Sequence, residues 1–146
     1  IGINLIDRLG RRQLMYYGSF GYIVSLSLVG CAFFFAWEGV LIPIFFFLFI
    51  ASHAIGQGAV IWVFISEIYP NHLRNTGQAF GSAIHWILAA AIPSFVPFLF
   101  ASIGVGTVFM IFAGMMVFQL LFVHFIMPET KGISLEQLSE KLSSKT

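Results

Sequence analysis

The sequence predicts an all-α membrane protein, a polytopic bundle in which four complete helices cross the bilayer. The first observation is composition, because 59% of the residues are hydrophobic and only 9% are charged, whereas an average soluble domain carries about 25% charged residues. So few charges cannot cover a surface that faces water, and we therefore expect lipid to surround most of the chain. The second observation is the spacing of the charged residues, which leaves apolar runs of membrane length.

Three runs contain no Asp, Glu, Lys or Arg. Residues 13–37 and 39–66 each predict one helix, because a membrane span needs about 20 apolar residues. Residues 75–128 are too many for one span, and the small residues and paired glycines of 101–106 indicate a turn between two spans. The predicted helices are 14–37, 41–68, 76–100 and 106–127.

Two short segments flank the helices. Residues 1–12 are expected to hold the end of a preceding helix and a loop, and because the chain opens on Ile1 without an initiator methionine, we expect the N-terminus to be a cut. In residues 128–146, Ser134 is typical of a helix N-cap and Gln137 of its capping-box partner, which favours a short amphipathic helix. A frayed, solvated tail is the alternative, since isolated helices this short are marginal.

Basic residues predict the orientation in the membrane. Four crossings place the N-terminal segment, the loop 69–75 and the C-terminal tail on the same side. All seven Lys and Arg residues of the chain lie on that side: Arg8, Arg11, Arg12, Arg74, Lys131, Lys141 and Lys145. Because cytoplasmic loops carry the excess of basic residues, we expect a multi-pass protein of the plasma or inner membrane with these three segments in the cytoplasm.

Several classes of function are not favoured by the composition. The net charge of +1 provides no basic field for nucleic acid. The single cysteine, Cys31, cannot form a disulfide within the chain. The predicted spans contain neither clustered carboxylates nor metal-ligand spacings, so the sequence predicts no enzyme, no metal site and no cofactor.

A cluster of charges precedes the first complete helix. Residues 7–12 read Asp-Arg-Leu-Gly-Arg-Arg, which predicts a tight turn because Gly10 can take a positive φ. Guanidinium groups at this level suit either of two roles. They can anchor the topology by binding anionic lipid, or one of them can pair bidentately with a carboxylate on the same side, such as that of Glu67.

This loop resembles the repeated loop signature of the major facilitator superfamily, and it is especially similar to the loop after the eighth helix of the sugar porter family. Three further segments resemble that family in the same order. Residues 56–62 resemble its glycine-rich segment that leads to a tryptophan in the tenth helix. Residues 67–70, Glu-Ile-Tyr-Pro, followed by Arg74 are similar to its E-x-[FY]-P-x-x-x-R motif. Residues 128–132 resemble its P-E-T-K-G signature, so the matches span nearly the whole chain.

The resemblance implies the C-terminal half of a twelve-helix transporter, from the end of helix eight through helix twelve and the tail. It implies transport of a monosaccharide, a hexose or a pentose, by alternating access, with the N-terminal half as the missing partner. Protons are a candidate coupling ion, facilitated diffusion is the alternative, and the identity of the sugar stays open. A structural or sensor subunit that does not transport is the other interpretation, although it would not need a glycine break or His and Trp residues at membrane depth.

Polar and amphipathic side chains at membrane depth are the candidate sugar contacts. Sugar sites combine hydrogen-bonding groups for hydroxyls with aromatic faces for the C–H patches of the ring. The resemblance implies that Trp62 and Trp86 contact sugar, and that His85 lies where the eleventh helix usually presents an amide. It also implies that His53 and His85 match two histidines of a fructose-transporting branch. The candidate substrate-binding residues are His53, Gln57, Gly58, Trp62, His85 and Trp86.

A break in the second predicted helix decides whether these residues can act together. In a regular helix His53 and Trp62 would face opposite sides, so they share one cavity only if residues 56–58 unwind. The family often has prolines in this segment, where this chain has Gln57, Ala59 and Ile61. For each histidine the alternative role is a hydrogen bond that packs one helix against another.

Charged residues on the cytoplasmic side are the candidate gate. An ionised Glu67 near the edge of the hydrocarbon requires a cation, and Arg74 follows it after the turn at Pro70. The two residues form either a solvated interfacial pair, worth under about 1 kcal/mol, or part of a charge network that breaks when the gate opens. The candidate gating residues are Asp7, Arg8, Arg11, Arg12, Glu67 and Arg74.

Overall fold

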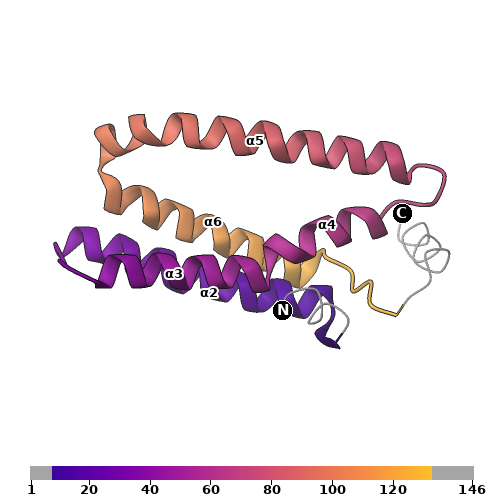
Figure 1. Ribbon diagram of the computed structural model, residues 1–146, viewed down its shortest axis with the longest axis horizontal. Helices are drawn as coiled ribbons and strands as arrows, with labels where there is room; N and C mark the ends of the chain where they lie inside the picture. Colours follow the sequence, from indigo (N-terminus) through magenta and orange to yellow (C-terminus); the bar gives the residue numbers. More distant parts are fainter. Residues whose placement is uncertain (1–7, 133–146) are drawn as a thin grey trace.

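The computed structural model describes residues 8–132, and in this range the chain is built of α-helices joined by short turns (Figure 1). The helices are α2 (Arg11–Phe34), α3 (Leu41–Ile55), α4 (Gln57–Glu67), α5 (Arg74–Ile103) and α6 (Val105–Phe125). Helices α3 and α4 together form one segment of 27 residues, so the described range holds four segments that are long and apolar enough to cross a membrane. The predicted all-α class with four membrane helices is confirmed.

Helix α2 begins earlier than the predicted range 14–37, because a distant carboxylate caps its first turn, and it ends earlier as well, at Phe34. The side chain of Glu129 accepts hydrogen bonds from the backbone N–H of Arg11 at 3.0 Å and of Arg12 at 3.1 Å. A negative charge at a helix N-terminus satisfies unpaired N–H groups and complements the helix dipole. The helix therefore starts inside the charged loop, directly after Gly10 with φ 94°.

Three sequence expectations lie outside the described residues. These are the end of a preceding helix before the charged loop, the side chain of Asp7, and the amphipathic helix predicted in the tail.

The helices form a packed group and one helix that stands apart. Helices α2 and α3 lie side by side, α6 packs along α2, and α5 runs along the other edge of the bundle (Figure 1). In the membrane-spanning part of α2, 44% of the residues are buried inside the chain, against 0% for α5. Helix α5 therefore offers nearly its whole length to whatever surrounds this chain.

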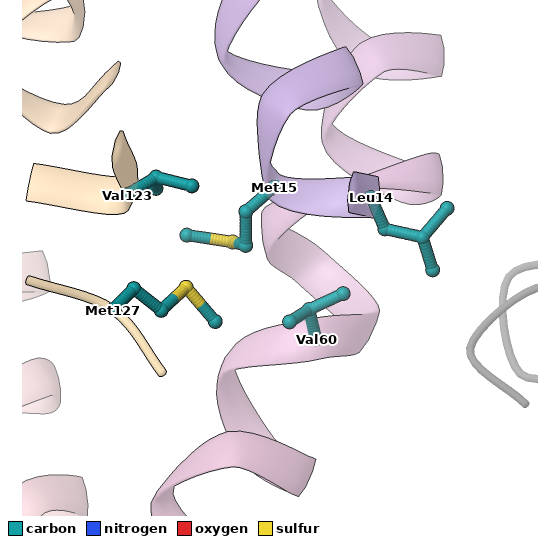
Figure 2. Packing of buried hydrophobic residues seen from close by; sticks show 5 residues of the cluster. All are labelled: Leu14, Met15, Val60, Val123 and Met127. Atoms are coloured by element: carbon teal, nitrogen blue, oxygen red, sulfur yellow. The ribbon is translucent and has the colours of Figure 1, made fainter. Parts of the chain in front are cut away.

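A hydrophobic core joins the ends of three helices. Its buried residues come from the start of α2, the first turn of α4, the end of α6 and the residues just after it, and each is at most 6% exposed. Four of them, Met15, Val60, Val123 and Met127, gather in one group, with Leu14 beside them (Figure 2). This core fixes α4 against α2 and α6, so the direction of α4 is set independently of α3.

The segment predicted as one helix, 41–68, is interrupted at Gly56, which ends α3 and precedes α4. At this point the backbone of Gly56 crosses that of Gly18 in α2. A Cβ atom added to Gly56 would lie 2.7 Å from the Cα atom of Gly18, a distance that real Cβ contacts do not reach. The close approach of α3 and α4 to α2 thus requires glycine at Gly56.

Helix α5, in contrast to the segment 41–68, is not interrupted. It contains Pro93 and Pro97, yet it continues as one helix of 30 residues from Arg74 to Ile103.

Candidate functional site

Three aromatic side chains from α4 and α5 meet and form the candidate sugar site, with His85 in an edge-to-face arrangement to each of the two indoles. The ring centroids of Trp62 and His85 lie 5.0 Å apart with an interplanar angle of 71°. Trp86 completes the group, with its ring 5.5 Å from that of His85 and 6.4 Å from that of Trp62. We call these three residues the aromatic group. The group connects α4, the second half of the segment interrupted at Gly56, to α5, the helix that is least buried.

The aromatic group is open to the surroundings of this chain. Trp62 is 40% exposed and Trp86 is 64% exposed, although both lie in membrane-spanning segments. The two indoles offer apolar faces, and the imidazole of His85 offers one donor and one acceptor in its neutral form. This combination of polar and aromatic groups suits a ligand that has both hydroxyls and C–H faces.

His53 is not brought to the aromatic group. Its Nδ1 atom makes a short hydrogen bond with the hydroxyl of Tyr22 in α2, and the two rings stack with centroids 6.1 Å apart. Gly58 provides the space for this imidazole, because a Cβ there would lie 2.7 Å from the Nε2 atom of His53. The geometry of His53 is that of a helix-packing contact between α3 and α2.

Gln57 also points toward α2, where it joins a polar cluster that sequence reasoning missed. Its Nε2 atom donates to the Oγ atom of Ser19 at 3.2 Å, and the Nε2 atom of Gln119 in α6 donates to the same oxygen at 3.0 Å. Ser19 is fully buried, and the Oε1 atom of Gln57 is buried without a partner in the described range. The available signal was the presence of Gln57 and Gln119 in apolar spans, since polar side chains in a membrane hydrogen-bond across helices.

A second cluster joins the ends of α2 and α4. The Nη2 and Nε atoms of Arg11 donate to the two carboxylate oxygens of Glu67 at 2.7 Å and 3.1 Å. The hydroxyl of Thr130 donates to the same carboxylate at 2.5 Å. The side chains of Arg11 and Glu67 are only 12% and 21% exposed. Such a bidentate, partly buried pair is stronger than a solvated interfacial pair.

The segment after α6 closes this cluster. Glu129 caps α2 as described above, and its Oε1 atom also accepts the backbone N–H groups of Thr130 and Lys131, each at 3.0 Å. A Cβ at Gly10 would lie 2.7 Å from the carboxylate of Glu129, so this glycine makes room for the cap. Sequence reasoning recognised the segment as a signature but did not identify Glu129 and Thr130 as partners of α2 and α4.

The other charged candidates are distributed around this cluster. Arg74 donates to the Oδ1 atom of Asn71 at 2.6 Å, within the turn that leads into α5, and so differs from the expected partnership with Glu67. Arg12 donates to the backbone carbonyls of Val123, at 3.0 Å, and of His124. The backbone carbonyl of Arg8 accepts from the Nζ atom of Lys131 at 2.7 Å.

Four apolar crossings, one of them broken beside an aromatic group, are typical of a multi-pass membrane protein. Comparison with known proteins gives the family. The family model described as "Sugar (and other) transporter" matches residues 1–142. The chain belongs to the sugar porter family of the major facilitator superfamily, whose members are transporters and not enzymes.

Individual relatives agree with this assignment. The chain is 38% identical to the arabinose-proton symporter of Bacillus subtilis (strain 168), over 97% of this chain and 31% of that protein. It is 39% identical to the major myo-inositol transporter IolT of the same organism, over 96% of this chain and 30% of that protein. The inward open conformation of the xylose transporter XylE from E. coli superposes with a TM-score of 0.90 at 29% identity, over 96% of this chain and 32% of that chain. The chain thus spans about a third of the length of these relatives.

Proposed function

We propose that this chain forms the C-terminal part of a twelve-helix transporter that moves a monosaccharide, a pentose or a hexose, by alternating access. The observation that carries the proposal is the aromatic group of Trp62, His85 and Trp86, assembled from α4 and α5. Its setting supports the proposal, because the helix that carries Trp62 is broken, and transporters place substrate sites beside broken helices. Relatives named for arabinose and xylose support a pentose.

Each member of the aromatic group has a distinct role in this proposal. Trp62 and Trp86 pack against the C–H faces of the sugar ring, and His85 hydrogen-bonds one hydroxyl. The exposed faces of the two indoles are turned away from this chain, so the sugar is enclosed when the N-terminal half of the transporter covers them. We further propose that protons drive uptake, as the name of the arabinose-proton symporter suggests for that relative.

Direct binding measurements on the purified full-length transporter test the sugar site. A panel of arabinose, xylose, glucose and myo-inositol first identifies the tightest ligand. Losing one neutral hydrogen bond costs about 0.5–1.5 kcal/mol, and more if a buried partner is left unpaired, so His85→Ala should weaken binding by roughly three- to thirty-fold. Trp62→Ala should weaken it at least as much, because it removes a large apolar face.

A histidine away from the aromatic group provides the matched control. His72 is exposed in the turn between α4 and α5, and His72→Ala should leave the dissociation constant unchanged. If both His85→Ala and Trp62→Ala bound every sugar of the panel as tightly as the wild type, the site would lie elsewhere and these residues would serve only helix packing.

The cluster of Arg11, Glu67 and Thr130 supports a role in gating. It ties the ends of α2 and α4 to the segment after α6 at the side where the basic residues gather. We propose that this cluster stabilises one conformation of the transporter and opens in the other, as part of a network to which Asp7, Arg8, Arg12 and Arg74 contribute. A population shift of this kind changes turnover more than the intrinsic affinity for sugar.

The basic residues also support the proposed orientation, with the 69–75 turn and the C-terminal tail in the cytoplasm of a plasma or inner membrane. Asn71 and Ser102 are exposed at opposite ends of α5. In a Cys31→Ser background, a cysteine introduced at Ser102 should react with an impermeant thiol reagent added outside the cell, whereas a cysteine at Asn71 should not. The reverse labelling pattern would invert the orientation.

A further inference from the structure

An open apolar groove runs between α2 and α6, away from the aromatic group. It encloses about 620 Å³ and lies between Tyr16, Tyr17 and Phe20 of α2 and Leu120, Leu121 and Phe125 of α6. The outer residues are well exposed, with Tyr17 at 60%, Phe20 at 66% and Phe125 at 76%. Because α2 and α6 are both long and apolar enough to span the membrane, the groove lies at the depth of the lipid acyl chains and has an apolar lining that suits them.

Polar groups stand at one end of the groove. The hydroxyl of Tyr16 and the Nδ1 atom of His124 are hydrogen-bonded at 2.8 Å. The guanidinium of Arg12 lies 5.9 Å from the centre of the Tyr16 ring and donates to the carbonyls of Val123 and His124 at the end of α6. The groove therefore has an apolar body and a basic head.

The charge of Arg12 differs from that of its neighbour Arg11. Arg11 is neutralised by the carboxylate of Glu67, whereas the side chain of Arg12 bonds only backbone carbonyls within the described range. These two bonds use the Nε and Nη2 atoms and leave the Nη1 donors available. Among the residues that the structure describes, no carboxylate pairs with this guanidinium, and a guanidinium with available donors is suited to a phosphate group.

We propose that this groove binds one anionic phospholipid of the cytoplasmic leaflet. The phosphate lies on the Nη1 donors of Arg12 beside the Tyr16–His124 pair, and an acyl chain lies between Phe20 and Leu121. When the Tyr16 hydroxyl donates to Nδ1 of His124, the Nε2 atom of the ring carries a hydrogen and provides a second donor. The basic side of the chain faces the leaflet that is rich in anionic lipid, so charge and depth agree. This site does not depend on which substrate the transporter carries.

Native mass spectrometry of the purified full-length transporter tests the site. Phosphatidylglycerol and phosphatidylcholine with identical acyl chains are titrated separately against the protein. We expect one phosphatidylglycerol to bind at least ten-fold more tightly than phosphatidylcholine, and inorganic phosphate at millimolar concentration not to displace it. Arg12→Gln should reduce the preference at least three-fold, whereas Arg74→Gln, which removes an arginine of the same side away from the groove, should retain it.

A second variant keeps the test decisive if Arg12→Gln fails to fold. Leu121→Trp leaves the basic head intact and fills the apolar body, and it should lose the tightly bound phosphatidylglycerol. Equal binding of the two lipids by the wild type, or a preference that survives both variants, would overturn the proposal. Absence of any retained phosphatidylglycerol on the wild type would also overturn it.

Discussion

The second and third membrane crossings, Leu41–Glu67 and α5, differ in whether the helix is interrupted, and the difference does not follow their prolines. The crossing from Leu41 to Glu67 has no proline near Gly56, yet it breaks there into α3 and α4. Helix α5 contains Pro93 and Pro97, yet it runs unbroken. A proline removes one backbone hydrogen bond, but membrane helices tolerate it because neighbouring groups and small local adjustments satisfy the freed backbone carbonyl. The break at Gly56 coincides with a contact to α2, whereas α5 is almost uncovered. Tertiary contact, and not proline, decides where this chain bends.

The largest effect should follow from crowding the crossing of Gly56 and Gly18. Gly56→Ala places a Cβ atom 2.7 Å from the backbone of Gly18, and overpacking against backbone costs about 3 kcal/mol, the upper end of the usual range. We expect a clear loss of melting temperature in the purified full-length transporter. Gly114→Ala is the control, because nothing lies within 4 Å of a Cβ atom at that position. Equal melting temperatures for the two variants would show that a Cβ atom at Gly56 fits against the backbone of Gly18.

A smaller effect should follow from releasing the far end of α4. Glu67→Gln removes the negative charge that receives both bonds from Arg11, and hydrogen bonds to charged groups contribute about 1.5–3 kcal/mol. We expect a several-fold lower transport turnover, with sugar affinity within a few-fold of the wild type. Glu38→Gln alters an exposed glutamate at the opposite end of the bundle and should leave turnover unchanged. An unaltered turnover in Glu67→Gln would reduce the pair to an anchor of topology.

The smallest effect should follow from removing the prolines of α5. Pro93→Ala and Pro97→Ala, alone or together, restore backbone donors in a helix that is already continuous. Spin labels at Asn75 and Ser102, about 40 Å apart along a regular helix, should keep the same distance by pulsed electron paramagnetic resonance. A change of several ångströms would mean that the prolines do bend α5, and the contrast with Gly56 would fail.

The class of the protein and its four crossings could be predicted because they depend on composition and charge spacing, which are local. The positions of Trp62, His85 and Trp86 could also be placed together, since a resemblance to known transporters already orders their helices. The partners of the other polar residues could not. Gln57 was expected at the sugar, and nothing in the sequence indicated its bond to Ser19, whose hydroxyl also accepts a bond from Gln119, a hundred residues along the chain.

The same limit applies to the charged loop. Arg11 and Glu67 could be foreseen as one of several pairings, because both lie on the basic side. That Glu129 would cap α2 could not, since the cap joins residues 118 positions apart. Contacts of this kind depend on how the helices pack, and no local pattern in the sequence encodes them.

The chemistry of the Gly56 break has a consequence for movement. The first N–H groups of any helix lack partners, and in α4 these belong to Gln57, Gly58 and Ala59. All three donors exist, and regular bonds already flank them, from Gly56 N to Ser52 O at 3.0 Å and from Val60 N to Gly56 O at 3.1 Å. A bend made by prolines is permanent because its donors are missing. At the Gly56 break all the donors of a continuous helix are present, so a straight helix here would exchange the glycine crossing and the Gln57–Ser19 bond for backbone hydrogen bonds.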